Sequence, residues 1–193
     1  MRKLTYYVAT SVDGFIGDPT GDGEFFTRLL DPEYLEWMAA EYPETIPTHV
    51  RAALGLTLPE GRHFDAVIQG RGSYEVGLKE GVTSPFAHLA QYVASRSLAV
   101  SPDPAVEIVS GDVAARVREL KAQEGLGIWL CGGADLAGQL ADEIDEFVIK
   151  TYPLFLGSGM PMSRTGFALR ELTLQSTKAF GNGATVSTYA RKR

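Results

Sequence analysis

The chain has one cysteine, three histidines and no long apolar run. Cys131 cannot form an internal disulfide by itself, and the three histidines lie too far apart in sequence to complete a zinc ligand set with it. No stretch approaches the roughly 20 apolar residues that span a membrane. The N-terminal segment reaches Asp13 before any long apolar region, which makes it a poor signal peptide. We therefore expect a soluble, cytoplasmic protein with no metal and no membrane partner.

The sequence also has no excess of basic residues. It carries 18 Lys and Arg against 24 Asp and Glu, so its formal net charge is −6. General nucleic-acid binders usually present a basic face, so we expect no nucleic-acid partner. A small anionic ligand stays compatible, because a few arginines and backbone N–H groups suffice locally. No repeat or linker divides the chain, which predicts one domain over residues 1–193.

Alternating strand and helix patterns predict an α/β fold. Apolar, β-branched and aromatic runs predict strands at residues 4–12, 64–70, 92–95, 106–110, 128–131 and 145–153. Helical patterns predict helices at 32–42, 48–54, 73–81 and 113–124, the last capped by Asp112, and one more ending near 142. Strands at 167–177 and 184–193, joined by FGNG, predict a hairpin. We expect a mixed, mostly parallel central sheet with helices on both faces and an antiparallel C-terminal hairpin at one edge.

Glycines mark two places where a buried strand leads into a helix. One junction is Gly70-Arg71-Gly72-Ser73-Tyr74, and the other is Gly132-Gly133-Ala134-Asp135-Leu136. Glycine lets a ligand approach the backbone, and a helix N-terminus offers free N–H groups to a phosphate. Neither junction fits a Rossmann fingerprint or a Walker A motif, and either alone equally suits a tight turn or close packing. Because ligands of open α/β sheets bind at the carboxyl ends of strands, the two together favour an anion site.

A third strand end carries Ser95-Arg96-Ser97. A serine–arginine pair there could hold a 2′-phosphate, the group that distinguishes NADPH from NADH. Acids gather in the N-terminal loop, and a reductase needs a proton source beside the hydride acceptor, which makes Asp13 and Glu24 candidate catalytic residues. A turn-forming role for Asp13 and a solvated position for Glu24 are the simpler interpretations. Cys131, at the end of a buried strand, is expected to pack in the core.

Five motifs occur in a familiar order: VATSVDGFIG, QGRGSYE, YVASRS, IWLCGGADL and TYPLFLGSGMP followed by the hairpin. In this order the chain resembles the dihydrofolate reductase-like superfamily, and more closely the reductase domain of bifunctional riboflavin biosynthesis proteins and its stand-alone relatives. The resemblance covers nearly the whole chain. It implies an NADPH-dependent oxidoreductase that transfers a hydride to a pyrimidine- or pterin-related substrate, as 5-amino-6-(5-phosphoribosylamino)uracil reductase does. It also implies a homodimer.

The resemblance implies roles for single residues. Ala9 and Ile16 would flank the nicotinamide, and the loop after Gly17 would act as a lid. Residues 70–74 would bind the pyrophosphate and adenosine side of NADPH, while Ser95 and Arg96 would recognise the 2′-phosphate. Residues 132–136 would cradle the other phosphate, with the peptide between the two glycines typically cis.

Departures from the family pattern leave alternatives open. An acidic residue holds the pterin ring in dihydrofolate reductases, and the candidates here are Asp22, Glu24 and Asp31. The riboflavin-type substrate carries a 5′-phosphate, for which Arg62, Arg164 and Ser158 are candidates. A dihydrofolate reductase-type activity, a catalytically degenerate module that binds NADPH, and a domain without a nucleotide remain alternatives.

Overall fold

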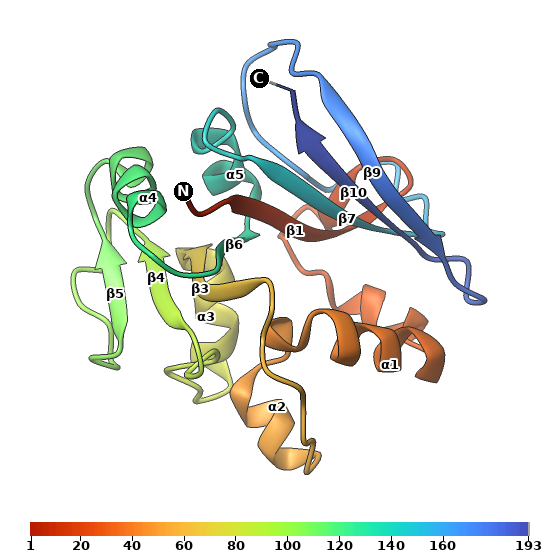
Figure 1. The fold of residues 1–193 in the computed structure, drawn as a ribbon, viewed down its shortest axis with the longest axis horizontal. Helices are drawn as coiled ribbons and strands as arrows, with labels where there is room; N and C mark the ends of the chain where they lie inside the picture. Colours follow the sequence, from red (N-terminus) through yellow and green to blue (C-terminus); the bar gives the residue numbers. More distant parts are fainter. Residues whose placement is uncertain (193) are drawn as a thin grey trace.

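A single eight-stranded sheet runs through residues 1–192, the part of the chain that the computed structural model describes. Its strand order is β5-β4-β3-β6-β1-β7-β10-β9 (Figure 1). The strands from β5 to β7 are parallel to one another, and β10 and β9 form an antiparallel hairpin at one edge. The bounds of these strands are β1 Leu4–Ser11, β3 Phe64–Gly70, β4 Ala90–Ala94, β5 Val106–Val109, β6 Gly127–Gly132, β7 Glu146–Tyr152, β9 Leu172–Ala179 and β10 Thr185–Arg191. The mixed, mostly parallel sheet with its edge hairpin is confirmed.

Helices cover both faces of the sheet because its strands are apolar on both sides. Side chains alternate along β1, so Leu4, Tyr6 and Val8 enter one core cluster while Tyr7 and Ala9 belong to the other. The first cluster includes residues of α4 (Val113–Ala122) and α5 (Ala134–Gln139). The opposite side carries α1, α2 and α3 (Figure 1), which span Pro32–Glu41, Thr48–Ala53 and Arg71–Lys79. Two 3-10 helices, η1 (Glu24–Leu29) and η2 (Pro43–Thr45), flank α1.

The second cluster is rich in aromatic side chains. Trp129 of β6 is buried in it, and its indole Nε1 donates to the Tyr7 carbonyl oxygen over 3.3 Å. The hydroxyl of Tyr152 donates to that of Tyr34 of α1 over 3.0 Å. Pairing of such polar tips satisfies groups that burial would otherwise leave without a partner. These contacts fix α1 against the sheet.

The helix ends follow the expected chemistry with small shifts. The Asp112 carboxylate accepts from the Ala115 N–H and caps α4 as predicted. The helix α3 begins at Arg71 rather than at residue 73, because Gly70 already has the extended backbone of a cap. The helix after Gly133 ends at Gln139 rather than near 142.

The C-terminal hairpin is shorter than the sequence suggests. The predicted strand 167–177 starts only at Leu172, which pairs with Arg191, the last residue of β10. Phe167 and Leu169 precede the hairpin and are exposed. Their alternating apolar pattern therefore does not come from pairing in this sheet.

A second, two-stranded sheet joins two loops near the carboxyl ends of the main strands. It consists of β2 (Phe15–Gly17) and β8 (Met160–Pro161). The Asp18 N–H donates to the Asp22 carbonyl oxygen, and the Met160 N–H donates to that of Asp18. The loop after Gly17 is thus held beside the 153–161 loop. Within residues 1–192, no helix is long and apolar enough to cross a bilayer.

Candidate functional site

A cleft of about 770 Å³ lies at the carboxyl ends of the strands from β5 to β6. Three of the strand ends that the sequence singles out meet there. Its lining includes residues 70–73, 95–97, 110–111 and 133–136, with Thr20, Gly21 and Met160 from the two loops above. Parallel strands place their carboxyl ends at one edge, so a motif after each strand contributes to one site.

Bare backbone forms part of this cleft. A Cβ added to Gly72 would meet no atom within 4 Å, and the same holds for Gly132, whose φ of +123° favours glycine. The peptide between Gly132 and Gly133 is cis, as the resemblance implies. A Cβ on Gly133 would face only the Met160 sulfur at 3.7 Å. The cradle is therefore open enough for a phosphate to approach amide groups directly.

Two arginines bring positive charge to the cleft, and they differ in their partners. The Arg71 guanidinium donates to the Ser97 hydroxyl over 2.5 Å and lies 3.2 Å from the Glu75 carboxylate. Arg96 is exposed and forms no ion pair with any residue of the described chain. The Ser95 hydroxyl accepts from the N–H groups of Ser97 and Leu98, so it holds the turn that presents Arg96. An anion in this cleft would find Arg96 free.

Some residues that the resemblance assigns to the cofactor lie elsewhere. Tyr74 is fully buried, and its hydroxyl donates to the Thr83 carbonyl oxygen over 2.6 Å, so its side chain belongs to the core rather than to the cleft. Ala9 and Ile16 lie outside the lining of the cleft. Ile16 is in β2, whose partner β8 supplies Met160 to the cleft.

The sequence reasoning missed residues at a fourth strand end. Ser110 and Gly111 follow β5 and line the cleft. They obey the same rule as the other three ends, because a small residue follows a buried parallel strand. Applying that rule to VEIVS would have found them.

Asp13 is held in place by hydrogen bonds. Its carboxylate accepts from the Ser11 hydroxyl at 2.6 Å and from the N–H groups of Leu156 and Gly157 at 3.2 and 2.7 Å. Desolvation by itself would raise the pKa of Asp13, but these hydrogen bonds outweigh it and lower the pKa overall. The residue thus fastens the 153–161 loop to the end of β1. Glu24 is exposed at the start of η1.

We expect the stabilising effect of Asp13 to depend on pH. Its contribution is fully present above the ordinary carboxyl pKa of 3.8 and is lost as the pH falls through the lowered pKa of the folded state. The Tm difference between the wild-type chain and Asp13→Ala should therefore be largest near neutral pH and shrink below about pH 4. Thermal melts from pH 3 to 7 measure it. A difference that stays constant over this range would contradict a role for the ionised carboxylate.

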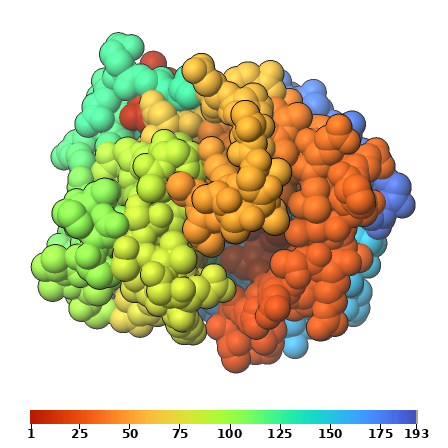
Figure 2. Space-filling model, turned by 90° about the horizontal axis from the view of Figure 1, so that it is seen from below, coloured from red at the N-terminus to blue at the C-terminus, as the bar shows by residue number. Residues whose placement is uncertain are grey.

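A hollow opens on the sheet face that carries the aromatic cluster. Figure 2 shows it between the N-terminal loop, in red-orange, and the segment that includes α3 and β4, in yellow and yellow-green. On this sheet face, Ala9, Cys131 and Lys150 are partly exposed. Burial lowers the pKa of Lys150 to about 8, and burial raises the pKa of the Cys131 thiol to about 11. Cys131 is thus no ready nucleophile, in agreement with its expected packing role.

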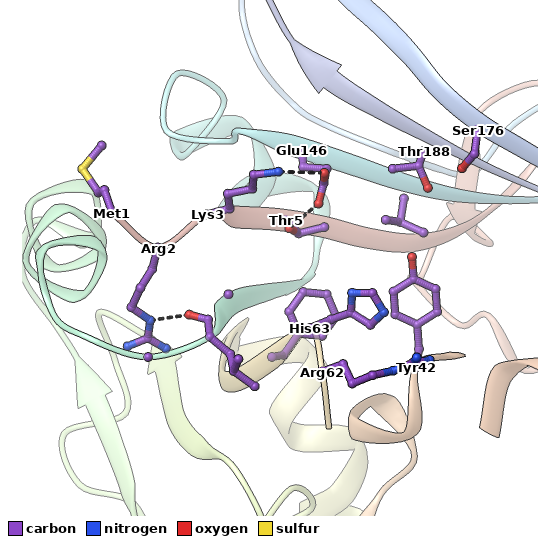
Figure 3. Close-up of a pocket in the computed structure, with 15 residues that line it drawn as sticks. Met1, Arg2, Lys3, Thr5, Tyr42, Arg62, His63, Glu146, Ser176 and Thr188 are labelled. Carbon is purple, nitrogen blue, oxygen red and sulfur yellow. Dashed lines mark hydrogen bonds and ion pairs between the residues drawn. The ribbon is translucent and has the colours of Figure 1, made fainter. Parts of the chain in front are cut away.

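A further hollow lies at the opposite, amino-terminal ends of the strands (Figure 3). Its Lys, Arg and His side chains already lie beside carboxylates. Lys3 lies 3.3 Å from Glu146, and Arg62 and His63 lie 3.2 and 3.1 Å from Glu41. Arg62, a candidate for a substrate phosphate, is therefore remote from the cleft. Of the other two candidates, Arg164 pairs with Asp135 at 3.3 Å and Ser158 is exposed.

No metal site is apparent in the described chain. Residues 1–192 contain no group of three or more His, Cys, Asp or Glu side chains placed to hold an ion. The groups available at the cleft are therefore backbone amides, hydroxyls, two guanidinium groups, the Gln139 amide and the Asp135 carboxylate, which is paired with Arg164. This set suits a ligand with several phosphates.

Comparisons with known proteins agree with this geometry. A family model described as the RibD C-terminal domain matches residues 2–186. The uncharacterized protein YwjB of Bacillus subtilis is 29% identical over 185 residues, which cover 93% of each chain. The fold also matches a protein assigned to riboflavin biosynthesis in Shewanella sp. PV-4, with a TM-score of 0.71 and 22% identity over the whole of both chains.

Two more solved structures share the fold at lower identity. One is a diaminohydroxyphosphoribosylaminopyrimidine deaminase/5-amino-6-(5-phosphoribosylamino)uracil reductase of Thermotoga maritima, with a TM-score of 0.63 and 14% identity, covering 99% of this chain and 57% of that one. The other is the dihydrofolate reductase of Enterococcus faecalis complexed with NADP(H), with a TM-score of 0.60 and 13% identity, covering 99% and 97%. These likenesses establish a dihydrofolate reductase-like fold.

Proposed function

The chain belongs to the RibD C-terminal domain family, and from that premise we propose that it is an NADPH-dependent reductase acting on a pyrimidine-related substrate. The observation that carries the proposal is the cleft. It joins open glycine backbone at two strand ends to Arg96 at a third, which has no ion-pair partner within residues 1–192. Family membership supports a reductase-type activity, while the cofactor and the substrate are our proposals.

The cleft fits a dinucleotide phosphate in several respects. Its volume of about 770 Å³ lies within the usual range for ligand sites of roughly 300–1,000 Å³. Amide groups after Gly70 and Gly133 would hold the phosphates, and Arg96 with Arg71 would hold the 2′-phosphate. The E. faecalis protein of the same fold is complexed with NADP(H), which adds support for this cofactor.

The protein's own residues would bind, orient and enclose the reactants. When bound, NADPH supplies the hydride. Thr20 and Gly21 cover one side of the cleft and Met160 another, and Asp13 fixes the 153–161 loop from which Met160 extends. A substrate would enter from the hollow on the aromatic face, since Cys131 on that face immediately precedes Gly132.

A dihydrofolate reductase-type activity is less well supported. The acids that compete for the pterin position already have local roles. The Asp31 carboxylate accepts from the Tyr34 N–H and caps α1, and the Asp22 carboxylate accepts from the Glu24 N–H. Glu24 is exposed on η1. None of the three pairs with Lys150 on the sheet face.

The first test is binding followed by turnover. We expect NADPH to bind well below millimolar concentration and more tightly than NADH in fluorescence titrations. The protein should then oxidise NADPH in the presence of 5-amino-6-(5-phosphoribosylamino)uracil, with dihydrofolate as the comparison substrate. Absence of binding by either nucleotide would overturn the proposal. Binding of NADPH without turnover of either substrate would favour the catalytically degenerate module.

We also propose a homodimer formed through the C-terminal hairpin. The strand β9 is an edge strand, exposed along nearly its whole length, and Leu174 is 55% exposed. Proteins usually cover or charge such an edge, and the apolar Phe167 and Leu169 lie exposed just before it. Sedimentation equilibrium should return twice the 20.9 kDa mass of the chain. A single chain mass at micromolar concentration would contradict the dimer.

A further inference from the structure

Lys150 lies where the aromatic face of the sheet first becomes accessible. It pairs in register with Ala9 of β1. Two residues earlier on the same face, Val148 pairs with Tyr7. Val148 and Tyr7 are 1% and 3% exposed, whereas Ala9 and Lys150 are partly exposed. This sheet face is therefore buried at the Tyr7–Val148 pair and partly exposed at the Ala9–Lys150 pair. Lys150 therefore lies on the same sheet face as the hollow of Figure 2, with its side chain over Tyr7.

The ammonium group of Lys150 has an aromatic contact but no anionic partner. Its Nζ lies 4.2 Å from the centroid of the Tyr7 ring. No carboxylate of the described chain forms an ion pair with it, whereas Arg71 and Arg164 near this end of the sheet each have one. A ring face replaces only part of the hydration that a partly buried ammonium loses. The site therefore lacks a negative or strongly dipolar oxygen or nitrogen.

The titratable groups around Lys150 do not supply this partner. From β6 comes Cys131, whose thiol raises the pKa of Lys150 against the larger lowering by burial. The hydroxyls of Tyr34 on α1 and Tyr152 on β7 bond to each other. Glu44 of η2 is buried, and its carboxylate accepts from backbone N–H groups of residues 63 and 64. On β10 the register partner is the uncharged Val186.

The sheet face that carries Lys150 adjoins the proposed cofactor cleft. Cys131 shares the sheet face of Lys150 and is followed at once by the Gly132-Gly133 cradle. Between them lies β1, and neighbouring strands are roughly 4.8 Å apart. A flat substrate ring lying over Ala9 would have one edge at the cleft. Its opposite edge would be within reach of the Lys150 side chain.

We propose that Lys150 is a catalytic residue that binds the oxygen or nitrogen of the substrate's C=O or C=N group and gives it a proton. The inference rests on the proposed reductase function. Reduction adds a hydride from the reduced nicotinamide, which is oxidised, to the carbon, and the π pair of the bond moves to the oxygen or nitrogen. That atom takes one proton from Lys150 Nζ, and water then restores the proton on the amine. The substrate class is thus one with a carbonyl or an imine, not a cationic ring that needs a carboxylate.

The geometry favours Lys150 over the two acids that the sequence suggests. The Asp13 carboxylate is engaged by a hydroxyl and two amides at the 153–161 loop. Glu24 is exposed at the start of η1. Sequence reasoning missed Lys150 because a lysine within an alternating strand normally reads as a solvated side chain.

The first experiment does not depend on turnover. Competitive acetylation with acetic anhydride from pH 6 to 11, read by peptide mass spectrometry, measures the reactivity of each lysine. Lys150 should reach half of its full reactivity near pH 8. Together, NADP⁺ and 5-amino-6-(5-phosphoribosylamino)uracil should reduce its labelling at least about five-fold. Lys79 is the internal control, because it is exposed at the C-terminal end of α3, outside the cleft and away from the proposed dimer hairpin. Its labelling should be unaffected.

The second experiment uses three variants. Lys150→Met should lower kcat on the order of 100-fold, a typical effect of losing a general acid, and added methylamine should restore part of the rate. Lys150→Arg keeps the charge, but its falling limb of kcat should move from near pH 8 to above pH 10. Lys79→Met should change neither kcat nor its pH profile.

The outcomes separate the two proposals. Binding of NADPH without turnover, while Lys150 labels near pH 8 and is protected, would overturn the reductase activity on these substrates but not the place of Lys150 in the site. A labelling midpoint above pH 10, or no protection by the two ligands, would overturn the role of Lys150. So would turnover by Lys150→Met at the wild-type rate and with an unchanged pH profile.

Discussion

Replacing Arg96 with alanine should weaken NADPH binding 10- to 100-fold and leave NADH binding within about two-fold, because a charge-assisted pair with a phosphate contributes about 1.5–3 kcal/mol. Arg96 projects from the turn after β4 into the cleft and has no ion-pair partner among residues 1–192. Its charge is therefore available to a ligand. The two nucleotides differ only in the 2′-phosphate, so the ratio of their dissociation constants isolates this contact.

The matched variant is Arg71→Ala. Arg71 lines the same cleft, but it already lies 3.2 Å from Glu75 and donates to Ser97. Part of its charge is thus compensated, and we expect a smaller loss of NADPH preference than for Arg96. Isothermal titration of both variants with both nucleotides gives the comparison. If Arg96→Ala bound NADPH and NADH with the wild-type ratio, the assigned role of Arg96 would be wrong.

Gly138→Ala should destabilise the protein by about 3 kcal/mol, at the upper end of ordinary overpacking effects. A Cβ at this position would lie 1.9 Å from the Arg164 carbonyl oxygen and 2.6 Å from its carbon. The Arg164 segment cannot easily withdraw, because its N–H donates to the Ala134 carbonyl oxygen over 3.0 Å. In a solvent-exposed helix the same change would instead stabilise the protein by roughly 0.5–1 kcal/mol. The sign of the change in the free energy of unfolding therefore tests the contact.

The control for this substitution is Gly111→Ala. A Cβ on Gly111 meets nothing within 4 Å, and its backbone φ is outside the left-handed region. We expect an unchanged Tm for this variant. For Gly138→Ala we expect a drop of roughly 6–12 °C, from about 2–4 °C per kcal/mol for a chain of this size. A Tm equal to or above that of the wild type would show that residues 160–166 do not pack against α5 in this way.

The sequence predicted those parts of the site that follow a local rule. Buried strands followed by glycine or serine mark the cleft at residues 70–73, 95–97 and 133–136, because strand order does not change which end of a parallel strand faces the ligand. The rule was wrong for Tyr74. This residue directly follows Ser73 on α3, but its side chain points into the core. Whether a helical residue faces a ligand or the sheet depends on the helix rotation, which the strand-end rule does not encode.

The position of Lys150 depends on tertiary packing alone. Its strand neighbours alternate as in any half-buried strand, and the lysine lies on the face that α1 and η1 cover. The side chain is partly exposed only because those elements cover this face incompletely. The segment before β9 is the reverse case, because Phe167 and Leu169 have the pattern of a strand but no partner within this sheet. Pairing and coverage are properties of the assembled fold.

The burial of Trp129 gives the protein an intrinsic optical reporter. The indole lies in the aromatic cluster, two residues before Cys131 and three before Gly132, with its N–H engaged by the Tyr7 carbonyl oxygen. An indole shielded from water emits at shorter wavelengths than a solvated one, and its emission overlaps the absorption of a reduced nicotinamide. Excitation of Trp129 should therefore pass to a reduced cofactor in the adjoining cleft and not to an oxidised one. The intrinsic fluorescence of Trp129 would therefore report whether the bound nucleotide is reduced or oxidised.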